Sequence, residues 1–339
     1  MSHTTSSTRP NRVAETFDRP RRSPFVIAAI VSLIVAALVA CNVKSDKHTD
    51  SGVVTRPDTA VPQPASDSAT PASTIPQNVS FETADSAYQQ HRYQDASAMF
   101  TVYVQRRPNN PWGHYMLGLS AWKAGQLDVA RTAFERSLAL DSGQVKTYLN
   151  LGRVLLEQDK PREALERVTA ATQIDATSAE AFRMMGRVQS ALGQPDSAIG
   201  SYRVALSLDE NDVWSMNNMA LLLIQQERYD DALPALARAV EIRAGSPVFQ
   251  NNLGVALERT GHFLAAQEAY AAAVAADSTY VKAQTSLSRV TGLEDDPSTT
   301  PVDLAALAQK FELDVATWKA EGPMKVGVVK PDSVTVPKP

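Results

Sequence analysis

The chain has 339 residues, of which 44% are hydrophobic and only 6% are aromatic, a composition that favours an all-helical protein over a large β-sandwich. The net charge of −4 gives no electrostatic reason to expect a nucleic-acid partner. The single cysteine, Cys41, excludes a disulfide framework and a cysteine-based zinc site within one chain.

The N-terminal forty residues have the layout of an export signal. A basic segment precedes an apolar run over residues 25–41, and small residues close that run. The run ends Leu38-Val39-Ala40-Cys41, which resembles the lipobox of bacterial lipoproteins. The resemblance implies cleavage before Cys41 and acyl chains on its sulfur and its new amino group. We therefore expect residues 1–40 to be a signal peptide and Cys41 to contact the membrane through lipid.

An alternative is an uncleaved, single-pass membrane anchor formed by residues 25–41. A helix of that length rises about 26 Å, which is short of the roughly 30 Å hydrocarbon core, so the anchor needs a locally thinned bilayer. Both alternatives place the rest of the chain outside the cytoplasmic membrane. Asn42 is not the aspartate that retains lipoproteins in the inner membrane of enteric bacteria. The outer membrane is therefore favoured if the organism has two membranes.

The segment 41–76 joins the lipidated cysteine to the rest of the chain. It is rich in serine, threonine, aspartate and proline, and it has few large apolar side chains. Such a segment cannot bury enough apolar surface to offset the entropy lost on ordering. We therefore expect a disordered linker.

From residue 77 a pattern recurs every 34 residues over six periods, which start at residues 77, 111, 145, 179, 213 and 247. One column holds only alanine: Ala96, Ala130, Ala164, Ala198, Ala232 and Ala266. A second column holds small residues: Ala84, Gly118, Gly152, Gly186, Ala220 and Gly254. A third holds mostly bulky ones: Phe100, Phe134, Val168, Tyr202, Leu236 and Tyr270. Small residues let two helices approach closely and bulky ones fill the groove toward the next period, so each period predicts a helical pair.

A turn is expected between the two helices of each period, at His91, Gly125, Asp159, Gly193, Glu227 and Gly261. The period and its columns resemble those of tetratricopeptide repeats. The resemblance implies an all-α protein, an α-solenoid of six helix-turn-helix repeats over residues 77–290 whose last ten residues, 281–290, form a capping helix. Residues 291–339 are expected to form a linker, a short helix at 301–320 and an extended tail. The apolar stripe of that short helix predicts that it packs onto the end of the array. The alternative is that it lies in the chain's own groove or docks on a partner.

In tetratricopeptide repeats the first helix of each pair lines a concave groove. The resemblance therefore predicts a peptide-binding groove with aromatic, basic and amide zones. The aromatic zone is Trp112, Tyr115 and Trp122, the basic zone is Lys146, Arg153, Arg183 and Arg187, and the amide zone is Asn150, Asn217, Asn218, Asn251 and Asn252. An asparagine side chain offers both a donor and an acceptor to an extended peptide backbone. Similar asparagine ladders occur in tetratricopeptide domains that hold peptides lengthwise.

No catalytic or cofactor motif stands out in the chain. The five histidines lack metal-ligand spacing, and the glycine-rich nucleotide-binding patterns do not occur. We therefore expect no catalysis, no metal and no cofactor. The build of signal, linker and repeats is similar to that of the pilotin lipoproteins of type IV pili, which implies a non-catalytic adaptor for protein partners at the bacterial envelope. The alternatives are a subunit that binds or senses an envelope ligand such as a glycan fragment, and an accessory subunit of an enzyme encoded elsewhere.

Overall fold

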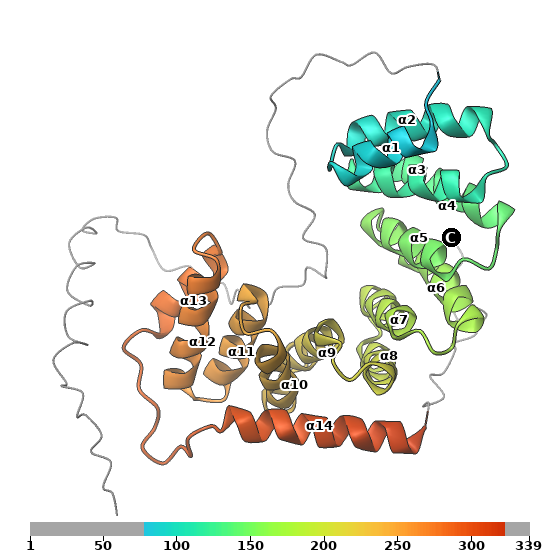
Figure 1. Cartoon of the computed structure of the whole chain (residues 1–339). Coiled ribbons are helices and arrows are strands. Elements are labelled where there is room, and N and C mark those ends of the chain that lie inside the picture. The colour runs from blue at the N-terminus through green and yellow to red at the C-terminus, as the bar shows by residue number, and fades with distance from the viewer. Residues whose placement is uncertain (1–77, 323–339) are drawn as a thin grey trace, which may run out of the picture. The chain divides into compact units, whose positions relative to one another are not determined.

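The computed structural model describes residues 78–322, which form fourteen α-helices and no strand (Figure 1). The predicted all-α solenoid is therefore confirmed. The signal segment, Cys41, the linker 41–76, the first residue of the predicted array and the tail from residue 323 lie outside the described residues. Among residues 78–322, no helix combines the length and the apolar character that crossing a bilayer requires.

Twelve of the helices form six consecutive pairs. The first helices of the pairs are α1 (Phe81–Gln89), α3 (Pro111–Lys123), α5 (Val145–Glu157), α7 (Ala179–Ala191), α9 (Val213–Gln225) and α11 (Pro247–Arg259). The second helices are α2 (Tyr93–Arg106), α4 (Leu127–Leu140), α6 (Pro161–Ile174), α8 (Pro195–Leu208), α10 (Tyr229–Ile242) and α12 (Phe263–Ala276). Two further helices, α13 (Val281–Val290) and α14 (Leu304–Glu321), follow the pairs. Helix α1 begins later in its period than the others because Ser80 caps it, accepting a hydrogen bond from the Thr83 backbone at 3.2 Å.

The small and bulky columns of the sequence meet inside each pair. A Cβ atom added to Gly118 would lie 2.6 Å from the Phe134 ring, and one added to Gly186 would lie 2.6 Å from the Tyr202 ring. These distances are well inside van der Waals contact, so the backbone of the first helix rests directly on the ring of the second. The period therefore specifies how closely the two helices pack, as well as where they begin.

The six predicted turn positions all adopt the left-handed backbone conformation. Glycine occupies three of them, with φ between 71° and 84°, while His91, Asp159 and Glu227 occupy the others with φ between 56° and 60°. Residues with a Cβ rarely adopt this conformation, because the Cβ approaches the carbonyl oxygen. The recurrence at every turn shows that the helical pair imposes the turn geometry whichever residue fills it.

Successive first helices touch one another along the whole array, from α1 and α3 through to α11 and α13. Within residues 78–322, the backbones of successive second helices do not come as close to each other, although the Arg131–Glu163 ion pair at 2.8 Å joins α4 to α6. The first helices therefore lie on the inner, concave side of the curved array, and the second helices form the outer side (Figure 1). This arrangement places the predicted groove residues on the inner side.

Helix α13 closes the array through a charged contact with the last repeat. Arg289 donates two hydrogen bonds to the Glu258 carboxylate, at 2.9 and 2.7 Å, and the Tyr270 hydroxyl donates a third at 2.8 Å. Burial raises the pKa of Glu258, but the hydrogen bonds and the Arg289 charge outweigh it, so this pKa lies below its usual value. Glu258 therefore stays ionised and holds α13 against α11 and α12.

The expectation that the C-terminal helix packs onto the end of the array was wrong. Helix α14 runs back along the outer side, where it packs against α10 and α8 and, within the described residues, does not touch α13 (Figure 1). Its apolar stripe is the one that the sequence indicated, with Phe311 and Val315 buried against α10 and α8. Asp303 caps its first turn by accepting from the Ala306 backbone at 3.0 Å. The amphipathic pattern identifies which face is buried, and the structure shows what buries it.

Candidate functional site

An exposed tryptophan marks the inner side of the second repeat. Trp112 is 51% exposed, and its ring stacks on that of Tyr115 with a centroid separation of 4.7 Å and an interplanar angle of 21°. Tyr115 is itself buried and packs against Phe134 with a centroid separation of 5.9 Å. Burial raises the pKa of the Tyr115 phenol, which therefore stays neutral. The Tyr115 ring thus holds the Trp112 ring in place from one side.

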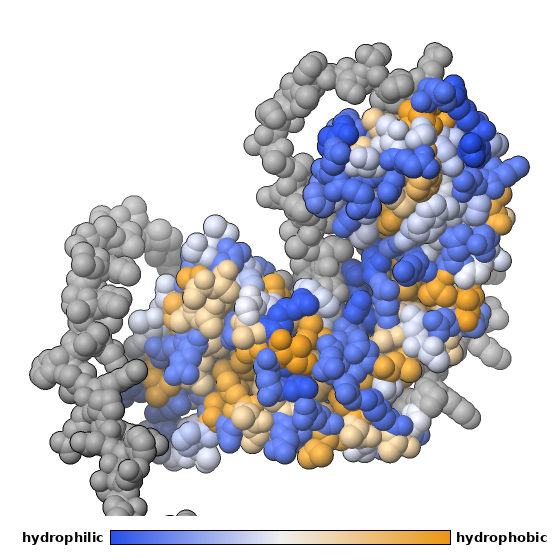
Figure 2. Space-filling view, viewed as in Figure 1, coloured by the Kyte–Doolittle hydropathy of each residue, from blue (hydrophilic) through white to orange (hydrophobic). Residues whose placement is uncertain are grey.

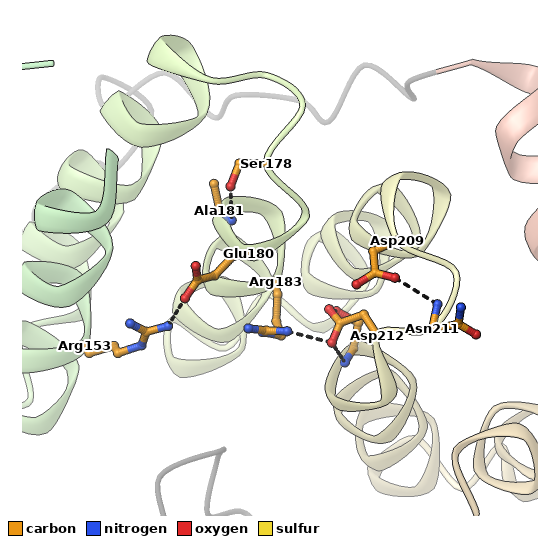
Figure 3. Close-up of polar contacts among 9 residues, drawn as sticks. Arg153, Ser178, Glu180, Ala181, Arg183, Asp209, Asn211 and Asp212 are labelled. Atoms are coloured by element: carbon orange, nitrogen blue, oxygen red, sulfur yellow. Dashed lines mark hydrogen bonds and ion pairs between the residues drawn. The ribbon is translucent and has the colours of Figure 1, made fainter. Parts of the chain in front are cut away.

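A continuous set of contacts leads from this stack into the next two repeats. Asn150 of α5 donates a hydrogen bond to the Tyr115 hydroxyl at 3.2 Å. Arg153, one turn further along α5, donates to the Asn150 side-chain oxygen at 2.6 Å and pairs with Glu180 of α7 at 2.5 Å (Figure 3). Four predicted site residues are therefore joined: Trp112, Tyr115, Asn150 and Arg153.

The middle of the inner side contains ion pairs. Arg183 of α7 donates to the Asp212 carboxylate at 2.6 Å, and the Asp212 side chain is only 2% exposed (Figure 3). The same carboxylate accepts a hydrogen bond from the Ser215 hydroxyl at 2.6 Å, and Asp212 is the N-cap of α9. Of the other predicted basic residues, Lys146 is exposed and Arg187 is buried. The predicted basic zone is thus partly neutralised by Glu180 and Asp212.

Trp122 has a different environment from Trp112. It is only 7% exposed, and its indole nitrogen donates to the Glu157 carboxylate of the next repeat at 2.9 Å. The Lys123 ammonium lies 4.7 Å from the centre of its ring. Trp122 therefore joins two repeats, and its exposed area is small.

The four asparagines of α9 and α11 form a single hydrogen-bonded row. Asn251 donates to Asn252 at 3.4 Å, Asn252 donates to Asn217 at 2.8 Å, and Asn217 donates to Asn218 at 3.4 Å. All four side chains are between 1% and 7% exposed. The side-chain oxygen of Asn251, where the row begins, accepts no hydrogen bond from the described residues. The four side chains of the row are thus almost fully buried, and the Asn251 oxygen is an unsatisfied acceptor.

Three acidic residues complete the contacts between repeats, and the sequence analysis did not identify them. Glu157 and Glu180 each accept a hydrogen bond from a predicted groove residue of the preceding repeat, and Asp212, the N-cap of α9, accepts one from Arg183 of α7. The repeat frame gave a signal for two of them. Glu180 occupies the second position of its repeat, as Trp112 and Lys146 do, and Asp212 occupies the N-cap position, where aspartate is favoured. Their roles depend on distances across neighbouring repeats, which a single repeat pattern does not contain.

The described surface has no group of histidine, cysteine and acidic residues that could hold a metal ion. On the face shown in Figure 2, small apolar patches are interspersed with polar ones. Trp112 is the most exposed aromatic side chain of the inner side, and it adjoins the polar contacts described above. This combination suits a ligand that has both apolar side chains and backbone polar groups.

Two family models, both described as tetratricopeptide repeat, match the chain. One matches residues 81–145 and 217–283, and the other matches residues 121–188. Human tetratricopeptide repeat protein 7B is 30% identical over 127 residues, which cover 38% of this chain and 15% of that protein. The type IV pilus assembly protein PilF of Pseudomonas aeruginosa is 30% identical over 92 residues, which cover 27% of this chain and 36% of that protein. The chain thus aligns with less than half the length of these curated relatives.

A solved structure of the same Pseudomonas aeruginosa PilF has a similar fold. It superposes with a TM-score of 0.53 at 18% sequence identity, and the match covers 61% of this chain and 95% of that one. At this level of identity the likeness concerns the fold.

Proposed function

Because this chain is a tetratricopeptide-repeat protein, we propose that it is a non-catalytic scaffold that binds extended segments of partner proteins along its inner side. The observation that carries the proposal is the stack of Trp112, half exposed, on the buried ring of Tyr115. Tryptophan residues are enriched among the few interface residues that contribute most of the binding energy. A ring already held in place loses little side-chain entropy when a partner covers it.

The polar neighbours of Trp112 support a peptide as the ligand. Asn150 and Arg153 already hold each other and Glu180, so their orientation is set before any partner arrives. Further along, the unsatisfied oxygen of Asn251 suits a backbone N–H group of a bound segment, because an unmet buried acceptor costs roughly 1–3 kcal/mol. Asn251 is only 1% exposed, so this contact requires the amide to turn toward the groove. An extended peptide would thus have an apolar anchor at one end and a backbone contact at the other.

Replacing Trp112 by alanine should weaken peptide binding by about thirtyfold, which corresponds to the roughly 2 kcal/mol of a typical hot spot. The measurement is fluorescence anisotropy with labelled peptides selected from a random library against the unsubstituted chain. The matched control is Leu313→Ala, because Leu313 is 64% exposed but lies on α14, outside the groove. Equal affinity of both variants for the selected peptides would contradict the proposal. Displacement of those peptides by glycan fragments would instead favour the envelope-ligand alternative.

We further propose that the scaffold is attached to the bacterial envelope by lipid on Cys41. The proposal rests on the lipobox-like sequence that ends at Cys41 and on the likeness to a protein named for type IV pilus assembly. The proposed groove residues would then face the periplasm or the exterior, on the outer membrane if there are two. The alternative attachment is the single-pass anchor at residues 25–41.

Replacing Cys41 by alanine should abolish incorporation of a radiolabelled fatty acid, because both acylation sites belong to that residue. The measurement is autoradiography of the purified chain after growth with labelled palmitate. Cys41→Ser serves as a second variant that keeps the size of the side chain. Label that persists in both variants would contradict the proposal. An unlabelled parent chain that still sediments with membranes would indicate the anchor.

A further inference from the structure

Helix α14 joins two helices whose backbones do not otherwise come close to each other. Within the described residues, the backbones of α8 and α10 are not in contact, whereas α14 packs against both helices (Figure 1). They are the second helices of the fourth and fifth repeats, whose first helices carry Arg183 and Arg187 on α7 and Asn217 and Asn218 on α9. Helix α14 therefore spans one joint of the array from the outside, opposite the boundary between the basic and the amide residues.

Helix α14 contacts α8, the loop between α8 and α9, and α10. Trp318 packs on α8, where the Arg203 guanidinium lies 4.8 Å from the centre of its ring. Lys319 forms an ion pair with Glu210, which belongs to the loop between α8 and α9. Glu312 pairs with Arg238 of α10 at 2.7 Å. The contacts of α14 thus extend from the fourth repeat, through the connecting loop, to the fifth repeat.

The loop between α8 and α9 is held from both sides. On the inner side, Arg183 reaches the buried carboxylate of Asp212 at 2.6 Å, and Asp209 accepts from the Asn211 backbone at 3.1 Å (Figure 3). On the outer side, Lys319 of α14 pairs with Glu210 of the same loop. Helix α14 thus contacts directly the loop that precedes the first turn of α9.

We propose that α14 is a splint that fixes the fourth and fifth repeats relative to each other, and so sets the spacing between Arg183 and the asparagine row. The mechanical part of the proposal needs no ligand. Its consequence, that docking of α14 regulates binding along the inner side, rests on the proposed function. In a helical-repeat array each joint is otherwise fixed only by contacts between neighbouring repeats, so a helix bridging two second helices adds stiffness at that joint alone.

Helix α14 is attached to α8 and α10 through few buried side chains. Its fully buried side chains are Ala308, Phe311 and Val315, and a cavity of about 140 Å³ lies between α14 and α10 beside Arg238. Phe311 and Val315 line this cavity together with the charged side chains of Glu210, Arg238 and Glu312. Substitutions at the seam should therefore detach α14 while the repeats, which have their own core, stay folded.

The test measures distances between spin labels by double electron–electron resonance in the full chain, with Cys41→Ser as background. One pair of labels, at Arg162 on α6 and Glu268 on α12, spans the joint, and both positions are exposed. The second pair, at exposed Gln94 on α2 and at Arg162, spans only the first three repeats. The joint is opened by the double substitution Phe311→Asp and Val315→Asp.

We expect the distance distribution of the first pair to shift and broaden when α14 is detached, while that of the second pair stays the same. A label at exposed Leu313 reports detachment through its increased mobility. If Leu313 becomes mobile while the first distribution is unchanged, the splint proposal is overturned. Peptide binding has no part in this readout, so failure of the proposed function would appear separately, as equal peptide affinity after Trp112→Ala.

A milder variant tests the same contact without the risk that the double substitution unfolds the whole chain. Lys319→Glu places two like charges together at the inter-repeat loop, and the added change Glu210→Lys restores an opposite pair. We expect the first distance distribution to broaden in Lys319→Glu and to recover in the charge-swapped chain. A distribution that ignores both changes would contradict the role of α14 at this loop.

Discussion

Replacing Gly186 by alanine should lower the free energy of unfolding by about 1–3 kcal/mol, the usual cost of overpacking a close-packed core. The new methyl group would lie 2.6–2.8 Å from three atoms of the Tyr202 ring, and Tyr202 is only 2% exposed. The ring has no free space to move into, so α7 and α8 must separate. The measurement is chemical denaturation followed by circular dichroism, with hydrogen exchange of the α7 and α8 amides to localise the effect.

Gly200 on α8 provides the matched control. It is helical like Gly186, but a Cβ added there would meet no atom within 4 Å. Gly200→Ala should raise the stability by about 0.5–1 kcal/mol, because alanine favours a helix over glycine. Stability changes of opposite sign at Gly186 and Gly200 would distinguish the effect of close packing from that of helix propensity. A Gly186→Ala chain as stable as the parent would contradict the packing argument.

Replacing Asp212 by alanine should be the most damaging single change on the inner side, with a loss of about 3 kcal/mol. The carboxylate is 2% exposed and accepts hydrogen bonds from both Arg183 and Ser215. The substitution deprives Arg183 of a buried partner and removes the N-cap of α9 at once. The measurement is the denaturation midpoint, together with hydrogen exchange in the first turn of α9.

An exposed ion pair serves as the control for this change. Arg228 and Asp231 pair at 2.8 Å, but their side chains are 49% and 57% exposed. Exposed pairs contribute roughly 0–1 kcal/mol, so Asp231→Ala should cost far less than Asp212→Ala. Similar losses in the two variants would show that burial of Asp212 has no special weight. Asp212→Asn, which keeps the capping ability, should fall between the two.

The repeat architecture could be predicted almost completely from the sequence. The glycine and aromatic columns are consequences of direct contact, as Gly186 and Tyr202 illustrate, so the pattern determines which faces meet. The turn column was also informative, because every turn residue adopts the left-handed conformation, even where His91 or Glu227 occupies the position. A recurring constraint leaves a recurring residue pattern, and such patterns can be recognised from one chain.

The groove residues were harder to predict, because their surroundings differ from repeat to repeat. Asn251 and Asn252 occupy groove positions, yet they are only 1% exposed, since neighbouring first helices touch and cover those positions. Arg153 and Arg183 were expected to belong to a basic zone of the groove, but Glu180 of the following repeat and Asp212 at the N-cap of α9 neutralise them. Side-chain exposure depends on the local approach of two helices, which the repeat frame does not specify.

The position of α14 could not be inferred from its own sequence. Its stripe of apolar residues shows that one face is buried, but α8 and α10 form its seat only after the fourth and fifth repeats have stacked. The binding surface is therefore created by distant segments of the chain. Amphipathicity predicts burial, and tertiary structure decides the location.

The contacts of α14 also impose an order on folding. Elsewhere in the described residues, side-chain hydrogen bonds join residues at most 35 positions apart, as between Trp122 and Glu157, whereas Lys319 and Glu210 are 109 apart. Local contacts form early because they close only short loops, so the repeats can assemble from any starting point along the chain. Helix α14 has no seat until two particular repeats are complete. Its docking is therefore a late folding event, and a chain with α14 in place has already completed the part of the array that it covers.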